Sequence, residues 1–226
     1  MMPGLDAIRG QVTDRGYFVG NVTTCFGERD LLDLATGLGC PQRSLRSDAV
    51  VDFLKAKPAH RAFPNSLSSR FGLGRFPLHT DDAIARLPAK YLLLHNREGG
   101  ELAATVLLDM VRVFKGLDRQ ERAELTEAVF YIRNGLKSFP TTLVDPEHHY
   151  VRFDPNILRP TGRRALQLLN AIRTGIEQEN VERITWSRPT VLVVDNHRVL
   201  HGREAVREIR PSVVRTLLRI LVQERQ

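Results

Sequence analysis

Apolar positions near the start of the chain recur first with helical and then with strand spacing. Ile8 and Val12 lie one helical turn apart, and an apolar run follows at residues 17–19. This pattern predicts a short helix and then a strand. Between residues 28 and 38, leucines recur every three or four positions, and Gly39 follows the last of them. We therefore expect a second helix that ends at this glycine.

Beyond residue 78, short apolar runs of strand length alternate with turns. The expected strands lie at residues 91–94, 104–108, 150–153, 184–186, 191–194 and 216–222. Residues 58–77, which precede them, are rich in Pro, Ser, Gly and Arg, as is typical of a long loop. Strands dominate the second half and helices are inserted between them, which favours a mainly β sandwich or barrel.

Two helices are expected among these strands. The first covers residues 119–130. The second covers residues 161–179, where Thr161 is a suitable N-cap. Its apolar residues at positions 165, 168, 169, 172 and 176 form one stripe, which we interpret as a face packed on the core.

Length and composition restrict the class of protein. A chain of 226 residues, 42% hydrophobic and 26% charged, can bury one full core, so we expect a single domain over residues 1–226. No apolar run approaches the roughly 20 residues of a transmembrane helix. Charged residues interrupt the first twenty positions, so we expect no secretory leader. Cys25 and Cys40 are the only cysteines, and we interpret them as reduced thiols in a cytoplasmic protein.

The net charge of +7 is compatible with nucleic-acid binding. The 33 lysines and arginines are, however, scattered along the chain among 26 acidic residues and form no basic tract. We therefore keep nucleic-acid binding as an alternative and not as the leading interpretation.

Residues 78–81, Leu-His-Thr-Asp, carry a candidate metal site. In an extended strand His79 and Asp81 point to the same face, and an imidazole and a carboxylate can bind a divalent metal when a third ligand joins them. His201 is the candidate third ligand, because an apolar strand, a turn at residues 195–196 and a returning strand carry it back to the interior. Two histidines and one carboxylate form the facial triad of non-haem Fe(II) oxygenases. The alternative is that His201 is a hydrogen-bonded core histidine.

Arg215 and Arg219 lie in an apolar run that follows the candidate ligands. On a strand both face the same side, and a buried guanidinium needs an anionic partner. A dicarboxylate co-substrate would supply that partner through a bidentate pair. The alternative is a pair of surface arginines on an edge strand.

In this order, the motifs resemble the taurine dioxygenase family (TauD/TfdA-like) of Fe(II)- and 2-oxoglutarate-dependent oxygenases, in its clavaminate-synthase-like branch. The resemblance runs from about residue 65 to residue 222. Residues 79–81 are similar to the family's His-x-Asp motif, and residues 99–105 are similar to its Gly-Gly-x-Thr segment. Residues 195–203, Asp-Asn-His-Arg-Val-Leu-His-Gly-Arg, match the stretch around its distal histidine. The resemblance implies a double-stranded β-helix, the jelly roll of cupin-like proteins.

The resemblance also implies a reaction. Iron(II) is held by His79, Asp81 and His201, and 2-oxoglutarate and O₂ are consumed with release of succinate and CO₂ while a C–H bond of the substrate is oxidised. A carboxylate at position 81 fills the place where halogenating relatives bind chloride. Hydroxylation is therefore favoured over halogenation.

The co-substrate site follows from the same resemblance. Thr105 helps to hold a carboxylate of 2-oxoglutarate, and Arg215 pairs with its C5 carboxylate. Arg219 matches a second arginine that lies near co-substrate or substrate in several members. Asp195 or Asn196 orients His201 from behind, unless the two simply form the turn.

Four charged side chains are candidates for contact with the substrate. Arg75, in the loop before the first ligand, and Arg203 could each meet a carboxylate. Arg152 and Asp154 lie two residues apart and could bind the two charged groups of an amino acid. Ordinary salt bridges are the alternative for each of them.

The leading interpretation is a dioxygenase that hydroxylates a small polar, amino-acid-like metabolite in a specialised biosynthetic pathway. The same site could instead carry out desaturation, epoxidation or cyclisation. A metal-free, basic nucleic-acid-binding protein on this fold is the alternative from another class, and its binding would weaken steeply with salt.

Overall fold

A computed structural model describes residues 2–44, 47–62, 64, 66–100, 103–135, 137–206 and 216–225. Its centre is formed by two antiparallel sheets. In the six-stranded sheet the order is β1 (Tyr17–Asn21), β11 (Thr190–Asp195), β5 (Tyr91–Asn96), β13 (Thr216–Gln223) and β2 (Cys40–Gln42), with β3 (Asp52–Lys55) also paired to β13. In the four-stranded sheet the order is β10 (Glu182–Ile184), β6 (Thr105–Asp109), β12 (Val199–Arg203) and β4 (Phe76–His79).

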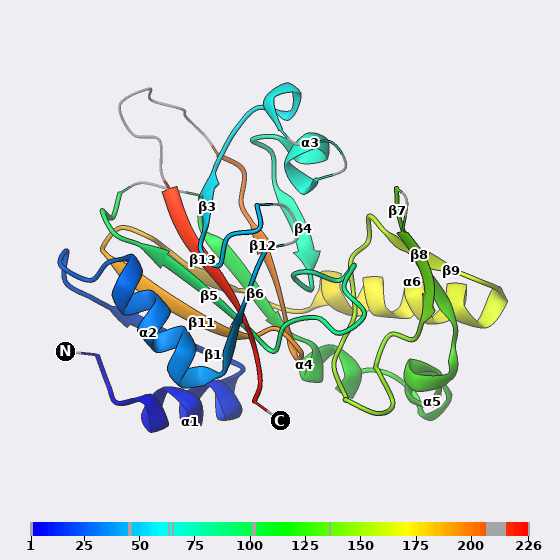
Figure 1. Ribbon diagram of the computed structural model, residues 1–226. Helices are drawn as coiled ribbons and strands as arrows, with labels where there is room; N and C mark the ends of the chain where they lie inside the picture. Colours follow the sequence, from blue (N-terminus) through cyan, green and yellow to red (C-terminus); the bar gives the residue numbers. More distant parts are fainter. Residues whose placement is uncertain are drawn as a thin grey trace.

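A third sheet and the helices surround this pair (Figure 1). The third sheet has the order β8 (Lys137–Thr141), β7 (Phe130–Asn134) and β9 (Leu158–Pro160). The helices are α1 (Leu5–Arg15), α2 (Glu28–Leu38), the 3-10 turn η1 (Ala59–Arg61), α3 (Leu67–Phe71), α4 (Met110–Lys115), α5 (Arg119–Glu127) and α6 (Arg163–Gln178). None of the helices in the described ranges is long and apolar enough to cross a membrane.

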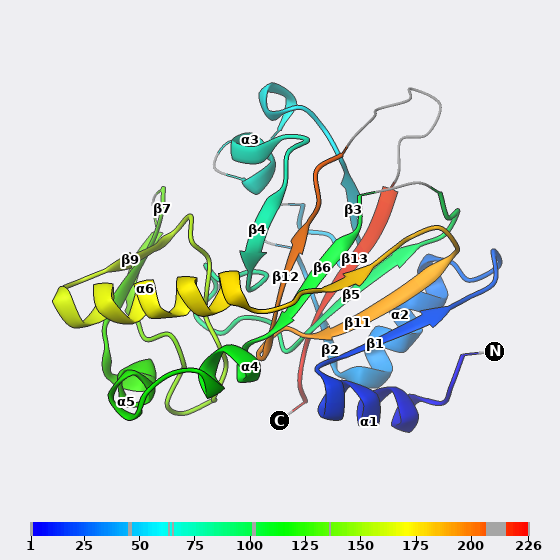
Figure 2. The same cartoon turned by 180° about the vertical axis from the view of Figure 1, so that it is seen from behind.

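Three apolar layers hold the elements together. Helices α1 and α2 cover the outer face of the six-stranded sheet, where Leu31 and Ala35 pack on Val193 and Ile220. The second layer lies between the two central sheets. The third joins the four-stranded sheet to α4, α5, α6 and the small sheet. In Figure 2, seen from behind, α6 and the three-stranded sheet lie at one end of the molecule and α1 and α2 at the other.

The alternation of side chains along β5 shows why its sequence is a continuous apolar run. Leu92 and Leu94 face the layer between the sheets, whereas Leu93 faces α1 and α2. Strand β11 is buried on both faces in the same way. A strand in this position needs apolar residues at every position, because neither face meets water. The expected mainly β, jelly-roll fold with inserted helices is confirmed.

Several expected elements differ from those observed. Residues 150–153 form no ladder but only an isolated bridge between Val144 and Val151, because their amides bond to loops: Arg152 N–H donates to Leu143 O. The expected long loop at 58–77 contains two short helices and the start of β4. An apolar pattern therefore located the buried residues here, but it did not reveal their hydrogen-bond partners.

The two later helices are confirmed, with corrected ends. Helix α5 ends at Glu127, and the apolar residues after it enter β7. Helix α6 begins after Gly162, which is its N-cap. Thr161 does not cap it, because its hydroxyl donates to Val129 O at 2.6 Å. The apolar stripe of α6 is buried as expected.

Candidate metal centre and its surroundings

Strand pairing brings the two candidate histidine ligands together. His79 on β4 lies directly opposite His201 on β12, and residues directly opposite in an antiparallel pair share one face. Their ring centroids are 4.3 Å apart. His201 is also opposite Leu107 on β6, whose side chain belongs to the layer between the two central sheets. Both imidazoles therefore point into the sandwich.

Asp81 joins the histidines from a turn and not from a strand. Strand β4 ends at His79, and Thr80 turns away from it, with its amide bonded to Phe153 O. The carboxylate of Asp81 nevertheless returns to the same face, with Oδ2 3.9 Å from His201 Nε2. Asp81 and His201 thus lie close together, but the extended segment assumed for Asp81 is wrong. The role of the three side chains as metal ligands stays a prediction.

Asn196 fixes the backbone at Asp81. Its Oδ1 accepts from Asp81 N–H at 2.8 Å, and its Nδ2 donates to Asp81 O at 3.1 Å and to Ala89 O at 2.9 Å. Asp195 instead pairs with Lys90 Nζ at 2.8 Å. The side chains of this turn therefore bond to Asp81 and Lys90 and not to His201 as suggested.

Arg219 reaches the site from the opposite sheet. Its Nη1 donates to both carboxylate oxygens of Asp81 at 3.0 Å. Its Nε and Nη2 donate to Asp52 Oδ2 at 3.2 and 2.5 Å. Asp52 is opposite Arg219 in the pairing of β3 with β13. The sequence analysis missed Asp52, because only this long-range register brings it to the site.

Burial and the neighbouring polar groups act in opposite directions on the pKa values of the two carboxylates. Burial alone would raise the pKa of Asp81, but the Arg219 guanidinium, the two histidines and the Asp82 amide together outweigh it, so that this pKa lies below its usual range. Burial would also raise the pKa of Asp52, but Ser47 and Arg219 lower it overall. Burial, and then the neighbouring His79, lower the pKa of His201 to about 3. At neutral pH the site holds ionised carboxylates and a neutral His201.

The donor set fits a metal of the facial-triad type. His79 Nδ1 lies 3.0 Å from Pro77 O. Because a carbonyl only accepts, Nδ1 must carry the proton, and Nε2 keeps its lone pair for a metal. His201 Nδ1 is buried with no partner in the described ranges. No three His, Cys, Asp or Glu side chains in the described part of the chain are already grouped as a metal site.

The two predicted co-substrate residues besides Arg219 have different outcomes. Thr105 is buried on β6, opposite Arg203. Its hydroxyl accepts from Trp186 Nε1 at 3.1 Å. Arg215 lies outside the described residues. The role of both residues stays a prediction.

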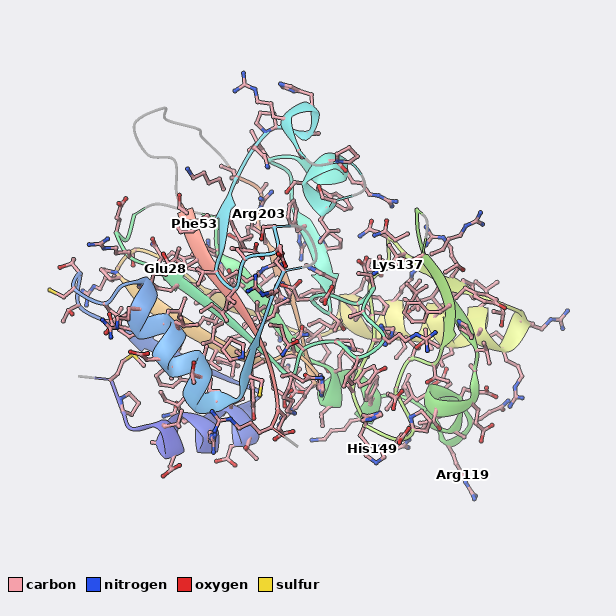
Figure 3. All side chains as sticks on the ribbon, viewed as in Figure 1. Glu28, Phe53, Arg119, Lys137, His149 and Arg203 are labelled. Carbon is pink, nitrogen blue, oxygen red and sulfur yellow. The ribbon has the colours of Figure 1, made fainter. Side chains whose placement is uncertain are left out.

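The predicted substrate residues are not gathered around the candidate ligands. Arg75 is exposed, just before β4. Arg203 donates to Gly72 O at 2.7 Å and to Gly74 O at 2.8 Å, and it stacks over Phe76. Burial lowers the pKa of Arg203 to about 10. Arg203 is the last residue of β12 and lies in the upper middle of Figure 3, whereas His149 lies at the lower edge.

Arg152 and Asp154 are used within the protein. Arg152 is 1% exposed, and its guanidinium bonds to main-chain carbonyls of residues 83–86. Asp154 accepts from the amide and the side chain of Asn156, at 2.8 and 2.9 Å. The structure thus gives both side chains internal partners in place of the two ends of an amino acid.

Comparison with known proteins identifies the fold. No model of a protein family matches the chain, and no curated protein matches it. Solved structures do match. An asparagine oxygenase in complex with Fe(II), 3-hydroxyasparagine and succinate superposes with a TM-score of 0.80 at 18% identity, covering 97% of this chain and 78% of that one.

Two further structures agree with this result. The non-haem iron oxygenase OrfP, with Fe, succinate and hydroxyarginine, gives a TM-score of 0.75 at 20% identity and covers 98% of this chain and 81% of its own. PvcB, described as an Fe, α-ketoglutarate-dependent oxygenase from an isonitrile synthetic pathway, gives a TM-score of 0.72 at 16% identity. The match covers 97% of this chain and 80% of PvcB. The chain therefore has the jelly-roll fold of these iron oxygenases.

Proposed function

We propose that this protein is an Fe(II)- and 2-oxoglutarate-dependent dioxygenase that hydroxylates a small, amino-acid-like metabolite. The observation that carries the proposal is the convergence of His79, Asp81 and His201 between the sheets of this fold. His79 and His201 are 122 positions apart in the sequence, yet they are opposite each other in the β4–β12 pairing. The jelly-roll neighbours with bound Fe support the same assignment.

Each proposed ligand contributes in a different way. His79 and His201 would offer Nε2 lone pairs, and Asp81 one carboxylate oxygen. Arg215 and Thr105 would hold 2-oxoglutarate, and Arg219 would balance the negative charge beside the ligands. When bound, iron and 2-oxoglutarate supply the oxidation of a C–H bond by O₂. The apolar layer on both sides of the ligand strands keeps bulk water from this reaction.

The proposed substrate class rests on the ligands of the structural neighbours. Asparagine oxygenase and OrfP are described with hydroxylated amino acids bound, which supports an amino acid or a close derivative here. Of the predicted substrate side chains, Arg152 and Arg203 donate from their Nη atoms to loop carbonyls. Arg75, which is exposed beside β4, is the predicted contact that we retain.

An anaerobic titration tests the proposal. Purified, metal-free protein is titrated with Fe(II) and 2-oxoglutarate while the visible metal-to-ligand charge-transfer band is recorded. We expect the band in the native protein and its loss or weakening in Asp81→Ala and Arg215→Ala. Arg133→Ala, which removes an exposed arginine of β7, is the matched control and should keep the band. If correctly folded native protein gives no band, the proposal is wrong.

Product analysis then separates the remaining reactions. Amino acids are screened for substrate-stimulated succinate release, and the mass of the product is measured. A gain of one oxygen atom supports hydroxylation, whereas loss of two hydrogen atoms indicates desaturation or ring closure. Epoxidation also adds one oxygen, but it requires an alkene in the substrate.

A further inference from the structure

The loop that carries Asp81 is held almost entirely by side chains from elsewhere in the chain. This ligand loop, residues 81–90, connects β4 to β5 and contains turns but no helix or strand. Six of its carbonyls accept from side chains: those of Asp81, Ala83, Ala85, Arg86, Pro88 and Ala89. Among the described residues, the side-chain donors to these six carbonyls lie in two segments, residues 150–152 and 196–197.

Arg152 supplies the largest share of these bonds. Its Nη1 donates to Ala83 O and, at 2.6 Å, to Ala85 O, and its Nη2 donates to Arg86 O at 2.6 Å. Tyr150 Oη accepts from the same Nη2 at 2.7 Å and donates to Arg86 O at 3.1 Å. A guanidinium that is 1% exposed loses its hydration, and these acceptors offset part of that cost.

The backbone directly after Asp81 is in an unfavourable conformation. Asp82 has φ of 53°, in the left-handed region that non-glycine residues rarely adopt. In this conformation Asp82 N–H donates to Asp81 Oδ1 at 2.9 Å. The other oxygen, Oδ2, is the one 3.9 Å from His201 Nε2. The Asp82 amide thus binds one carboxylate oxygen of Asp81, and the other oxygen is the one near His201.

We propose that Arg152 is a positioning residue for the metal-binding carboxylate. Asn196 fixes the loop at Asp81 itself, and Arg152 fixes it from Ala83 onward, so the strained Asp82 lies between two held points. This inference rests on the proposed function, because it concerns the same metal site. It assigns Arg152 to orienting Asp81 and removes it from the substrate contacts.

Binding of Co(II) alone tests the inference, with affinity and the visible ligand-field spectrum as readouts. Removal of a residue that orients a metal ligand typically weakens metal binding 10–100-fold. We expect Arg152→Met to weaken Co(II) binding by a factor in this range and to shift the bands of the Co(II) ligand-field spectrum. Arg152→Lys, which keeps the charge but not the planar fork, should restore part of the affinity.

Arg164→Met is the control for a general loss of stability. Arg164 pairs with the buried Glu124 between α5 and α6, so its loss should lower the melting temperature while Co(II) affinity and spectrum stay native. If Arg152→Met binds Co(II) with native affinity and spectrum despite a lower melting temperature, Arg152 is only structural and the inference is overturned. If native protein and Asp81→Ala bind Co(II) equally, the proposed metal site itself is wrong.

Discussion

The replacement of Arg219 by Met tests the electrostatics of the site most directly. The Arg219 guanidinium lies between the carboxylates of Asp81 and Asp52, with N–O distances of 2.5–3.2 Å. The three side chains are only 12–14% exposed. Arg219→Met keeps much of the apolar stem and removes the charge, so two buried carboxylates lose their shared cation.

The expected cost follows from this burial. Removing one partner of a buried ion pair typically destabilises a protein by about 3–5 kcal/mol, against a total stability of about 5–15 kcal/mol. We expect a loss in this range for metal-free protein at neutral pH. The measurement is guanidinium denaturation in the presence of a chelator, followed by circular dichroism.

Added metal should reverse part of the loss. A divalent ion on Asp81 replaces one of the two interactions that Arg219 made. Co(II) should therefore raise the stability of Arg219→Met more than that of native protein at the same degree of saturation. Adding Asp52→Asn to Arg219→Met should also restore part of the lost stability, because it removes the charge of one carboxylate that has no cation beside it. We expect this double variant to be more stable than Arg219→Met alone.

Two results would refute this reasoning. A loss below about 1 kcal/mol would mean that the carboxylates reach water or another cation once Arg219 is gone. A double variant less stable than Arg219→Met would mean that Asp52 stabilises the fold independently of the arginine. Arg219→Lys is the matched control. It should lose less than Arg219→Met, because one ammonium reaches one carboxylate but does not bridge both.

Three further outcomes are expected elsewhere in the fold. Burial lowers the pKa of His197 in the folded protein, so the unfolded chain binds a proton at this histidine first as the pH falls below about 6.5. The free energy of unfolding therefore decreases there by up to about 1.4 kcal/mol per pH unit. His197→Gln should reduce this slope in denaturation curves measured between pH 7 and 5. Gly16 has φ of 80°, and a Cβ there would lie 2.4 Å from Val199 Cγ2, so Gly16→Ala should lower the melting temperature, whereas the unhindered Gly4→Ala should not. Trp186→Phe removes the bond to Thr105 and should cost about 1–3 kcal/mol in denaturant titrations; an unchanged midpoint would contradict this.

The periodicity of the sequence predicted the elements whose burial is regular along the chain. Helix α2 has the expected ends, and β5, β11 and β13 lie where apolar runs were found. These segments are buried on fixed faces, so local pattern is sufficient to identify them. The short pieces β2 and β3 were missed, because their residues are mostly exposed and their strand conformation comes from pairing with β13.

The sequence by itself also identified the types of residue at the candidate site. The His-x-Asp spacing and the strand–turn–strand pattern before His201 are local features, and the fold confirms that these segments meet. Strand β4 ends at His79, two residues before the end of the extended segment that was expected, so Asp81 reaches the site from the following turn.

The tertiary structure alone decided the partners of each charged side chain. Arg219 was expected to face a co-substrate, and in the structure it bonds to Asp81 and, across the β3–β13 register, to Asp52. Arg152 was expected to meet a substrate, and it binds the loop after Asp81. Whether an apolar residue is buried depends on which face of its own helix or strand it occupies, and the periodicity of the sequence shows that face. A guanidinium pairs with whichever carboxylate or carbonyl lies within bonding distance. That distance is set by the register of strands that are far apart in the chain.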